Sequence, residues 1–408
     1  MQCTAPATPA TTPLSVPLSV SPRSLAAAFA HVPDPRRHAS VTYALSAILT
    51  LAVAAILANH LSVLAIAEWG ARQSPEVLRT LGFPAGRTPC QSTLQRLFSK
   101  LDSHALSAAL GAHFAPTVMA LPPEDSAQGV AVDGKAHRGR LPFQDGGCPV
   151  HALTAFCHEQ GVVLAHEPIA PGQGAEKGEA ELTVAPTLLA RVAWPGRVLT
   201  GDALFCQREL CQQVLEAGGD YLLLVKENQP TLYEDIRLLF DPPPSLAALP
   251  LLDQREAQTH DRGHGRQDEV RHLVASTDLN DYAAWPGLAQ VFRLRRTWRE
   301  HGATKQAVHY GITSLVPETG PPERLLALKR GHWVIENGLH RVKDVTLGED
   351  HSLIHQGQGP TIMALLRDAA VSLLRRSGIR QITARLRYHS QHPAAALALL
   401  VNQPAPDA

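Results

Sequence analysis

Three acidic residues of the sequence could form a site for chemistry on phosphate groups. Asp133 and Asp202 each follow a short apolar run, and Glu336 lies in a segment whose apolar residues recur at helical spacing. Two carboxylates a few Å apart repel by about 4 kcal/mol at an effective dielectric near 20, so three converging carboxylates call for a cation. Hard oxygen ligands, with no cysteine or paired histidine nearby, favour Mg²⁺ or Mn²⁺ over zinc. Two such ions can activate a water molecule and stabilise the leaving oxygen of a displacement at phosphorus.

The segment 331–344 aligns further polar groups with the third acid. In an α-helix, Glu336, His340 and Lys343 occupy positions i, i+4 and i+7, which predicts a carboxylate, an imidazole and an ammonium group on one face. Lys343 is then expected about 10 Å from the carboxylate, along the same groove, where it could contact a neighbouring phosphate. The alternative is an ordinary surface lysine paired with a nearby aspartate.

The elements around Asp133 and Asp202 indicate a mixed sheet flanked by helices, because short apolar strands alternate with helical segments. In such sheets, reacting groups collect at the ends of the central strands, where both aspartates stand. A proline-rich break at 241–244 precedes strand-like alternation that predicts an antiparallel β insertion at about 250–318. Before the break, strands are expected at 129–132, 151–157, 162–168, 197–200 and 221–225, and helices at 179–191 and 207–217.

The region 23–122 is predicted to be an all-helical N-terminal domain. Basic residues near its turns are compatible with a helix-turn-helix type DNA reader, although exposed arginines are common in helical domains. The run 41–58 carries no charge over about the length needed to cross a bilayer, so a membrane span is one interpretation. A buried helix is favoured, because no second span exists and Ser46 and Thr50 interrupt the run.

Composition and charge are those of a soluble protein with several domains. The chain has 408 residues, of which 45% are hydrophobic and 18% charged, as expected of a soluble protein with two or three domains. The 37 basic and 37 acidic residues give no global argument for nucleic acid. From His351 to Pro406, however, six arginines and one acid predict a basic surface. Six scattered cysteines and no secretory signal indicate a reducing compartment. Residues 1–22 are expected to form a disordered leader, and residues 401–408 a tail.

Several short motifs occur in order along the chain: PDPR (33–36), AIAEW (65–69), AVDGK (131–135) with Arg138-Gly139, TGDA (200–203), VKENQ (225–229), DRGHGR (261–266), RGHWVIENGLH (330–340) and DVTLGED (344–350). Together they resemble the motifs of bacterial insertion-sequence transposases of the DDE class, in the family that includes the H-repeat-associated transposases. Each motif is weak alone, but their number and order make the resemblance specific. Two positions depart from the family: Arg341 stands where tryptophan is usual, and Glu227 where glycine is usual.

The resemblance implies an RNase H-like catalytic domain at 123–400, in which Asp133, Asp202 and Glu336 hold two Mg²⁺ or Mn²⁺ ions. It implies a DNA transposase that cleaves DNA strands at element ends and transfers them to target DNA. The protein is expected to act as a homodimer on double-stranded DNA. Its expected location is the cytoplasm, at the nucleoid, with no membrane partner. A non-catalytic DNA-binding descendant and a nuclease of the same fold are the alternatives. The residues expected to contact DNA are Lys135, Arg138, Lys226, Asn228, Gln229, His332, His340 and Lys343.

Overall fold

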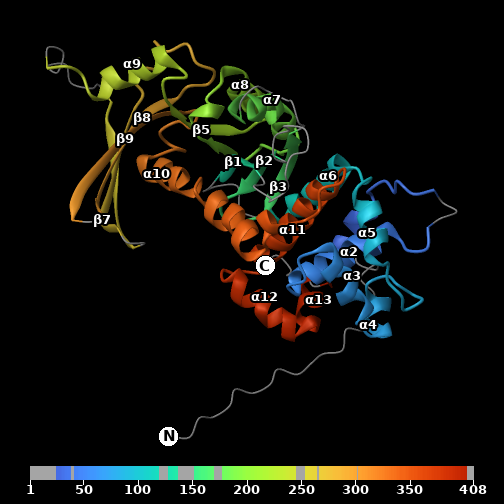
Figure 1. Ribbon diagram of the computed structural model, residues 1–408. Helices are drawn as coiled ribbons and strands as arrows, with labels where there is room; N and C mark the ends of the chain where they lie inside the picture. The colour runs from blue at the N-terminus through green and yellow to red at the C-terminus, as the bar shows by residue number, and fades with distance from the viewer. Residues whose placement is uncertain are drawn as a thin grey trace, which may run out of the picture.

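A nine-stranded mixed sheet forms the centre of the protein in the computed structural model (Figure 1). The structure describes residues 24–37, 41–118, 127–136, 151–169, 177–244, 253–263, 266–300 and 302–401. The strand order is β3-β2-β1-β4-β5-β9-β8-β7-β6. The strands are β1 (Gln128–Ala136), β2 (His151–Cys157), β3 (Val163–Ile169), β4 (Arg197–Gly201), β5 (Asp220–Val225), β6 (Arg255–Gly263), β7 (Arg266–Ser276), β8 (Gln290–Glu300) and β9 (Ala303–Thr313).

The sheet is parallel only at its centre. Strand β1 pairs in parallel with β4, and β4 pairs in parallel with β5. All five residues of β4 are buried, as expected of a strand covered on both faces. The antiparallel insertion strands do not form a separate layer, because β9 pairs directly with β5 and continues the same sheet. Figure 1 shows α7 (Lys177–Leu189) and α8 (Arg208–Glu216) on the side of the central strands opposite α10 (Pro322–Gly331).

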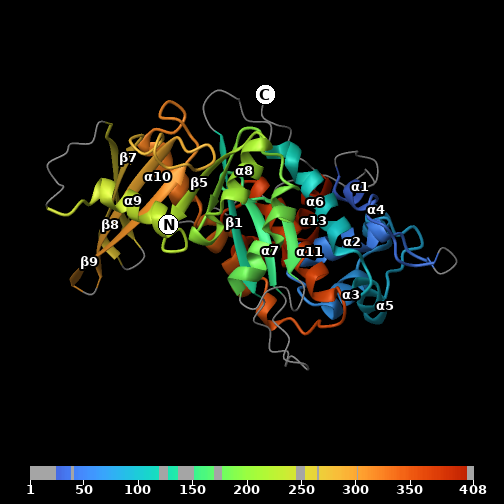
Figure 2. The same ribbon diagram turned by 90° about the horizontal axis from the view of Figure 1, so that it is seen from above.

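The N-terminal helices and the insertion lie at opposite ends of the molecule in both views (Figures 1 and 2). The apolar run resembling a membrane span is α2 (Leu45–Leu57), of which all residues but Ser46 are buried. Among the described residues, no helix is long and apolar enough to cross a bilayer. The other helices of this end are α1 (Leu25–Phe29), α3 (Val63–Ala71), α4 (Pro75–Thr80), α5 (Gln91–Phe98) and α6 (Ser103–Val118).

Helix α11 (Gly359–Arg376) connects the N-terminal helices to the sheet. It packs against α2 and α6 and also against β3. Fifteen of its eighteen residues are buried, which makes the N-terminal helices and the sheet share one hydrophobic core. The remaining helices are α9 (Pro230–Phe240), α12 (Ile382–Gln391) and α13 (Pro393–Val401), with short turns of 3-10 helix at η3 (Ala203–Phe205) and η6 (Glu349–His351).

The segment that carries Glu336 departs from the regular α-helix predicted for it. After α10 ends at Gly331, two π-helical turns follow, η4 (Glu336–His340) and η5 (Val342–Thr346). A π-helical turn closes hydrogen bonds from i to i+5 and is therefore wider than an α-helical turn. Residues seven apart consequently no longer share a face, which changes the direction of the side chains that follow Glu336.

Candidate active site

The two aspartates lie side by side on neighbouring parallel strands. The register pairs Ala131 of β1 with Thr200 of β4. Extending this register by two residues puts Asp133 of β1 opposite Asp202, the residue that directly follows β4, and on the same face, since side chains alternate along a strand. The 69-residue separation between the acids equals the separation of the paired residues 131 and 200, so the sheet register itself brings them together.

Glu336 and His340 complete one side of the candidate site. The Nδ1 atom of His340 lies 3.2 Å from Oε2 of Glu336 and 3.5 Å from Oδ2 of Asp133. The His340 side chain is only 5% exposed, whereas that of Glu336 is 52% exposed and that of Asp133 34%. The imidazole is thus fixed beneath two solvent-accessible carboxylates, in an arrangement that a cation could enter from solvent.

Asp133, Glu336 and His340 form a group that could hold a metal ion. One ligand atom from each residue lies within 4.8 Å of the others. Two carboxylate oxygens with one imidazole nitrogen suit Mn²⁺ as well as Mg²⁺, because imidazole is a softer donor than oxygen. The carboxylate of Asp202 is not a member of this group; its Oδ1 atom accepts a hydrogen bond of 2.9 Å from the backbone N–H of Leu204. It caps η3 in this way.

The loop after β5 supports the chain that follows Asp202. Nδ2 of Asn228 donates to the carbonyl of Ala203 at 2.6 Å, and Nε2 of Gln229 donates to the carbonyl of Cys206 at 2.9 Å. These bonds hold η3 in place and do not leave either amide wholly free for DNA. Lys226 is exposed and lines a groove with a volume of about 640 Å³ that also includes Asp202, Asn228, Tyr233, His309 and Tyr310.

Two histidines contact Thr200 of β4. Nε2 of His158 is 2.9 Å from Oγ1 of Thr200, and Nδ1 of His332 is 3.4 Å from the same hydroxyl. Burial lowers the pKa of His332 to about 3 and that of His158 to about 4, with Lys329 adding a repulsive charge. His332 is therefore buried and neutral near pH 7. The prediction that His332 contacts DNA is corrected, because its ring faces Thr200 inside the protein.

Gly331 allows α10 to approach these histidines. A Cβ atom at Gly331 would lie 2.3 Å from Nδ1 of His158, which no real contact permits. We expect Gly331→Ala to lower the free energy of unfolding by about 1–3 kcal/mol through overpacking. Gly338→Ala is the matched control, because its Cβ would meet Val334 Cγ1 at 3.3 Å, which a shift of a few tenths of an ångström in that side chain relieves. Thermal unfolding measures both variants; equal melting temperatures would show that the His158 contact does not require glycine.

Lys135 is engaged within the protein. It is buried, and its Nζ atom donates to Oδ1 of Asp344. Burial raises the pKa of Asp344, while the hydrogen bond from Lys135 acts in the opposite direction. This pair joins β1 to η5, so the expected DNA contact of Lys135 is replaced by a link between the first and third acid motifs. Arg138 lies outside the described residues.

Lys343 does not reach the groove of Glu336, and its predicted phosphate contact is wrong. The wider π-helical turns rotate it inward, and its side chain is 2% exposed. Its Nζ atom lies 2.7 Å from Oδ1 of Asp368 and 3.4 Å from Oε1 of Glu349. Burial opposes its charge, but these two carboxylates prevail and raise its pKa.

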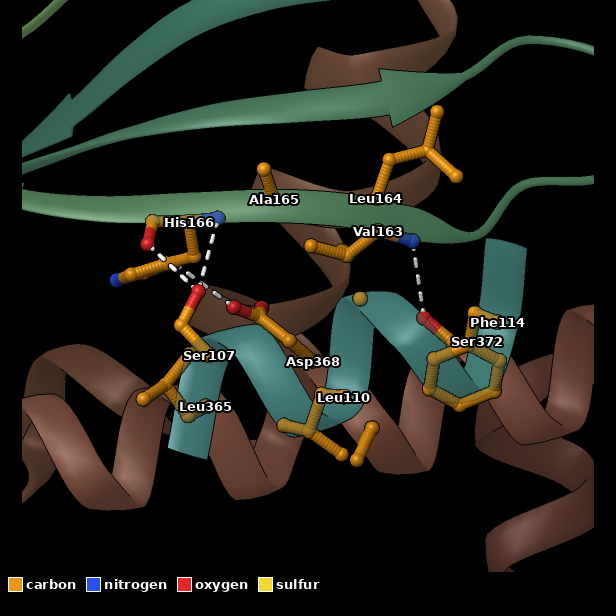
Figure 3. Close-up of a pocket in the computed structure, with 12 residues that line it drawn as sticks. Ser107, Leu110, Phe114, Val163, Leu164, Ala165, His166, Leu365, Asp368 and Ser372 are labelled. Carbon is orange, nitrogen blue, oxygen red and sulfur yellow. Dashed lines mark hydrogen bonds and ion pairs between the residues drawn. The ribbon is translucent and has the colours of Figure 1, made fainter. Parts of the chain in front are cut away.

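The ion pairs around Lys343 extend into a buried cluster between β3, α11, η5 and η6. Oδ2 of Asp368 is 3.0 Å from Nδ1 of His166 on β3, and Nη1 of Arg367 is 3.7 Å from Oε1 of Glu349. Figure 3 shows Ser107 and Asp368 directed toward His166, beside a cavity of only 10 Å³. Oγ of Ser107 donates to the His166 carbonyl at 2.8 Å. We refer to Lys343, Glu349, Arg367, Asp368 and His166 as the buried ion cluster.

The sequence contained one signal for this cluster. Arg367 and Asp368 interrupt a strongly apolar helix, and charged residues in such a position are rarely buried unless they are paired. Arg367 was assigned to the basic surface of the C-terminal region, but it is 2% exposed, so that part of the prediction is wrong. No spacing rule indicated the contribution of His166, which comes from a distant strand.

The sequence comparisons identify the family of the chain. A model described as "Transposase DDE domain" matches residues 125–374, and a model described as "DDE_Tnp_1-associated" matches residues 26–114. The chain belongs to the DDE transposase family. The acids Asp133, Asp202 and Glu336 all lie within the range of the DDE transposase domain.

Curated relatives of this DDE transposase family member extend over most of its length. The YncI protein of Escherichia coli O157:H7, named as a candidate transposase, is 28% identical over 84% of this chain and 85% of its own. YhhI of Escherichia coli K12, named as an H repeat-associated candidate transposase, is 25% identical over 84% of this chain and 88% of its own. A solved piggyBac transposase synaptic complex with hairpin DNA covers 96% of this chain and 84% of its own, at 11% identity and a TM-score of 0.38.

Proposed function

We propose that this transposase family member is a DNA transposase that cleaves DNA strands at the ends of an insertion sequence and transfers them to target DNA. The observation that carries the proposal is the meeting of Asp133 and Glu336, residues 203 positions apart, around one imidazole, with Asp202 in register beside them. Such convergence of acids costs repulsion, which a divalent cation would relieve.

The chemistry is two displacements at phosphorus. In the first, a water oxygen attacks the scissile phosphorus, the bond from phosphorus to the 3′ oxygen breaks, and that oxygen leaves as a 3′ hydroxyl group. In the second, this hydroxyl attacks a phosphorus of the target DNA, a new P–O bond forms, and a target 3′ oxygen leaves. Bound Mg²⁺ or Mn²⁺ supplies activation of the attacking oxygen and stabilisation of the leaving one. Asp133, Glu336 and Asp202 would hold the two ions.

Asp202 can take part without losing its hydrogen bond to Leu204. Its Oδ1 atom caps η3, but a carboxylate has further lone pairs, so Oδ2 can bind a cation while the cap persists. Lys329 lies nearby, and burial lowers its pKa to about 8, although the Asp202 carboxylate acts in the opposite direction. The negative charge of Asp202 and the positive charge of Lys329 thus attract each other.

The strand order supports the RNase H-like assignment within this proposal. Strands β3-β2-β1-β4-β5 combine an antiparallel meander with two parallel partners, and the acids follow the central pair. Double-stranded DNA is the proposed partner, with the N-terminal helices contacting element ends and a homodimer holding two ends together at the nucleoid.

A non-catalytic DNA-binding descendant is the second candidate. Glu227 favours it, because this exposed acid lies beside Lys226 in the groove near Asp202 and would repel a phosphate there. A nuclease of the same fold would cleave DNA without joining the released 3′ end to a target. Both candidates differ from a transposase in products that gel electrophoresis resolves.

The deciding experiment uses the full-length protein and a supercoiled plasmid that carries the DNA flanking its gene. With Mg²⁺ we expect cleavage at the element ends and joining of the labelled 3′ ends to a second plasmid, and no cleavage in EDTA. Binding without cleavage, in Mg²⁺ and in Mn²⁺, would favour the non-catalytic descendant. Cleavage without joining would favour the nuclease.

His340 provides a test of the metal site that does not depend on turnover. Asparagine at this position would offer an oxygen donor where the imidazole nitrogen was. We expect His340→Asn to weaken Mn²⁺ binding by about tenfold and Mg²⁺ binding by much less, because imidazole favours the softer ion. Electron paramagnetic resonance of free Mn²⁺, with Mg²⁺ as competitor, gives both dissociation constants in the absence of DNA. An equal loss for both ions would mean that His340 only positions Glu336 through its 3.2 Å contact.

A further inference from the structure

Two grooves adjoin along the outer side of the segment that carries Glu336. The first has a volume of about 590 Å³ and extends from the hairpin turn at His158–Gly161 past Trp333. The second, of about 470 Å³, extends along η5 and α12 to Arg387. Both are lined by Asn337, Arg375 and Arg380, so they form one continuous furrow.

The furrow is strongly basic. Arg341, Arg380 and Arg387 are exposed along it, and none of the ion pairs found in the described part of the chain involves them. Glu159 is the acid among the lining residues of the first groove, and the lining of the second contains none. Unpaired guanidinium groups in a row repel one another and need an anionic partner to offset that repulsion.

The backbone beneath the furrow is fixed. Nη1 of Arg375 donates to the carbonyl of Arg380 at 3.1 Å, and its Nη2 donates to the carbonyl of Gly338 at 3.4 Å. The hydroxyl groups of Thr346 on η5 and Thr383 on α12 lie 2.9 Å apart. Arg375 thus acts as a bracket between the helix of Glu336 and the start of α12, while the other arginines remain directed at solvent.

From these observations we propose that Arg341, Arg380 and Arg387 form a binding track for the phosphate backbone of duplex DNA that continues beyond the cleaved end. This inference rests on the proposed function and adds a surface distinct from the N-terminal helices. Guanidinium groups bind phosphate oxygens in a fork geometry without reading bases, so the track adds affinity for any sequence.

Trp333 extends the track toward the active site. Its side chain is 61% exposed on the same furrow, three residues before Glu336. An exposed indole beside the arginines offers a flat apolar surface to the same DNA.

The test measures the salt dependence of the dissociation constant for the full-length protein and a fluorescent 30-base-pair duplex of scrambled sequence. Neutralising one phosphate contact lowers the slope of log K against log salt by about 0.9. We expect the triple variant Arg341→Gln/Arg380→Gln/Arg387→Gln to lose nearly three units of slope and to bind at least about tenfold more weakly near 0.1 M salt. Each single variant should lose about one unit.

Arg237→Gln is the matched control. It removes the same charge from α9, at the far end of the molecule, where Arg237 pairs with Glu234. The control should keep the wild-type slope. A triple variant with the slope of the control would overturn the track, and so would a loss confined to single-stranded DNA. If the wild-type protein binds neither the scrambled nor the element-end duplex, the proposed function itself fails. If the wild-type protein binds and cleaves DNA but the triple variant keeps the wild-type salt slope, only this inference fails.

Discussion

Asp133→Asn and Glu336→Gln are each expected to lower metal-dependent strand cleavage by about 10³-fold or more. Each change keeps the shape of the side chain but removes the negative charge that would hold a divalent ion, whose stabilisation of the transition state amounts to several kcal/mol. The measurement is single-turnover cleavage of plasmid DNA with excess protein, at saturating Mg²⁺ or Mn²⁺. DNA binding at fixed salt should change little, because neither acid attracts phosphate.

The same variants make an opposite prediction for stability. Without metal, the neutral side chain relieves repulsion between Asp133 and Glu336, so the melting temperature in EDTA should stay constant or rise. Added Mn²⁺ should raise the melting temperature of the wild type and much less that of the variants. Glu209→Gln, at an exposed acid of α8, is the control that should behave as wild type in both measurements. Full cleavage by either active-site variant would remove these carboxylates from the reaction.

Asp202 requires a specific choice of substitution. Its side chain caps η3 by accepting from Leu204, and asparagine caps helices about as well as aspartate. Asp202→Asn therefore isolates the loss of charge, whereas Asp202→Ala would also remove the cap and cost about 1 kcal/mol of stability. Cleavage lost in both variants, with stability reduced only in the alanine variant, is the outcome expected of a metal ligand that also serves as a cap.

The sequence was informative where local chemistry determines structure. Apolar runs ending at Asp133 and Asp202 are strands because buried parallel strands require nearly continuous apolar residues. Their side-by-side placement could not be read from the sequence, because it depends on the register between β1 and β4, which pairs residues 69 positions apart. The polar edge strand β6 lies inside the predicted insertion, but its own bounds could not be read from apolar alternation, because an edge strand needs only one hydrogen-bonded neighbour and little apolar character.

The direction of Lys343 could not be predicted either. A regular α-helix would align it with Glu336, and nothing in the local sequence indicates the two π-helical turns that the structure contains. Packing explains them: the wider turns place Lys343 against Asp368 and Glu349 in the core while Glu336 stays exposed. Long-range ion pairing has overridden the local helical pattern, which is a tertiary effect.

The buried ion cluster leads to the second large expected effect. Lys343→Met fits a similar volume but leaves Asp368 and Glu349 without their buried cation. Removing one partner of a buried ion pair costs about 3–5 kcal/mol, because the remaining charges are desolvated and uncompensated. We expect the first thermal transition to fall by on the order of 10 °C. Differential scanning calorimetry of the full-length protein, without DNA or metal, measures it.

A compensating substitution distinguishes destabilisation by an uncompensated buried charge from destabilisation by poor packing of the methionine side chain. Lys343→Met leaves one excess negative charge in the cluster, and Lys343→Met/Asp368→Asn removes that excess while Arg367 still faces Glu349. The double variant should therefore be more stable than the single variant, with a coupling energy of about 1–3 kcal/mol. Because η5 continues directly from the turn that holds Glu336, the single variant should also bind Mn²⁺ more weakly, and the double variant should recover part of that affinity. A Lys343→Met protein with wild-type stability and a reduced DNA salt slope would instead return this lysine to the phosphate contact expected from the sequence.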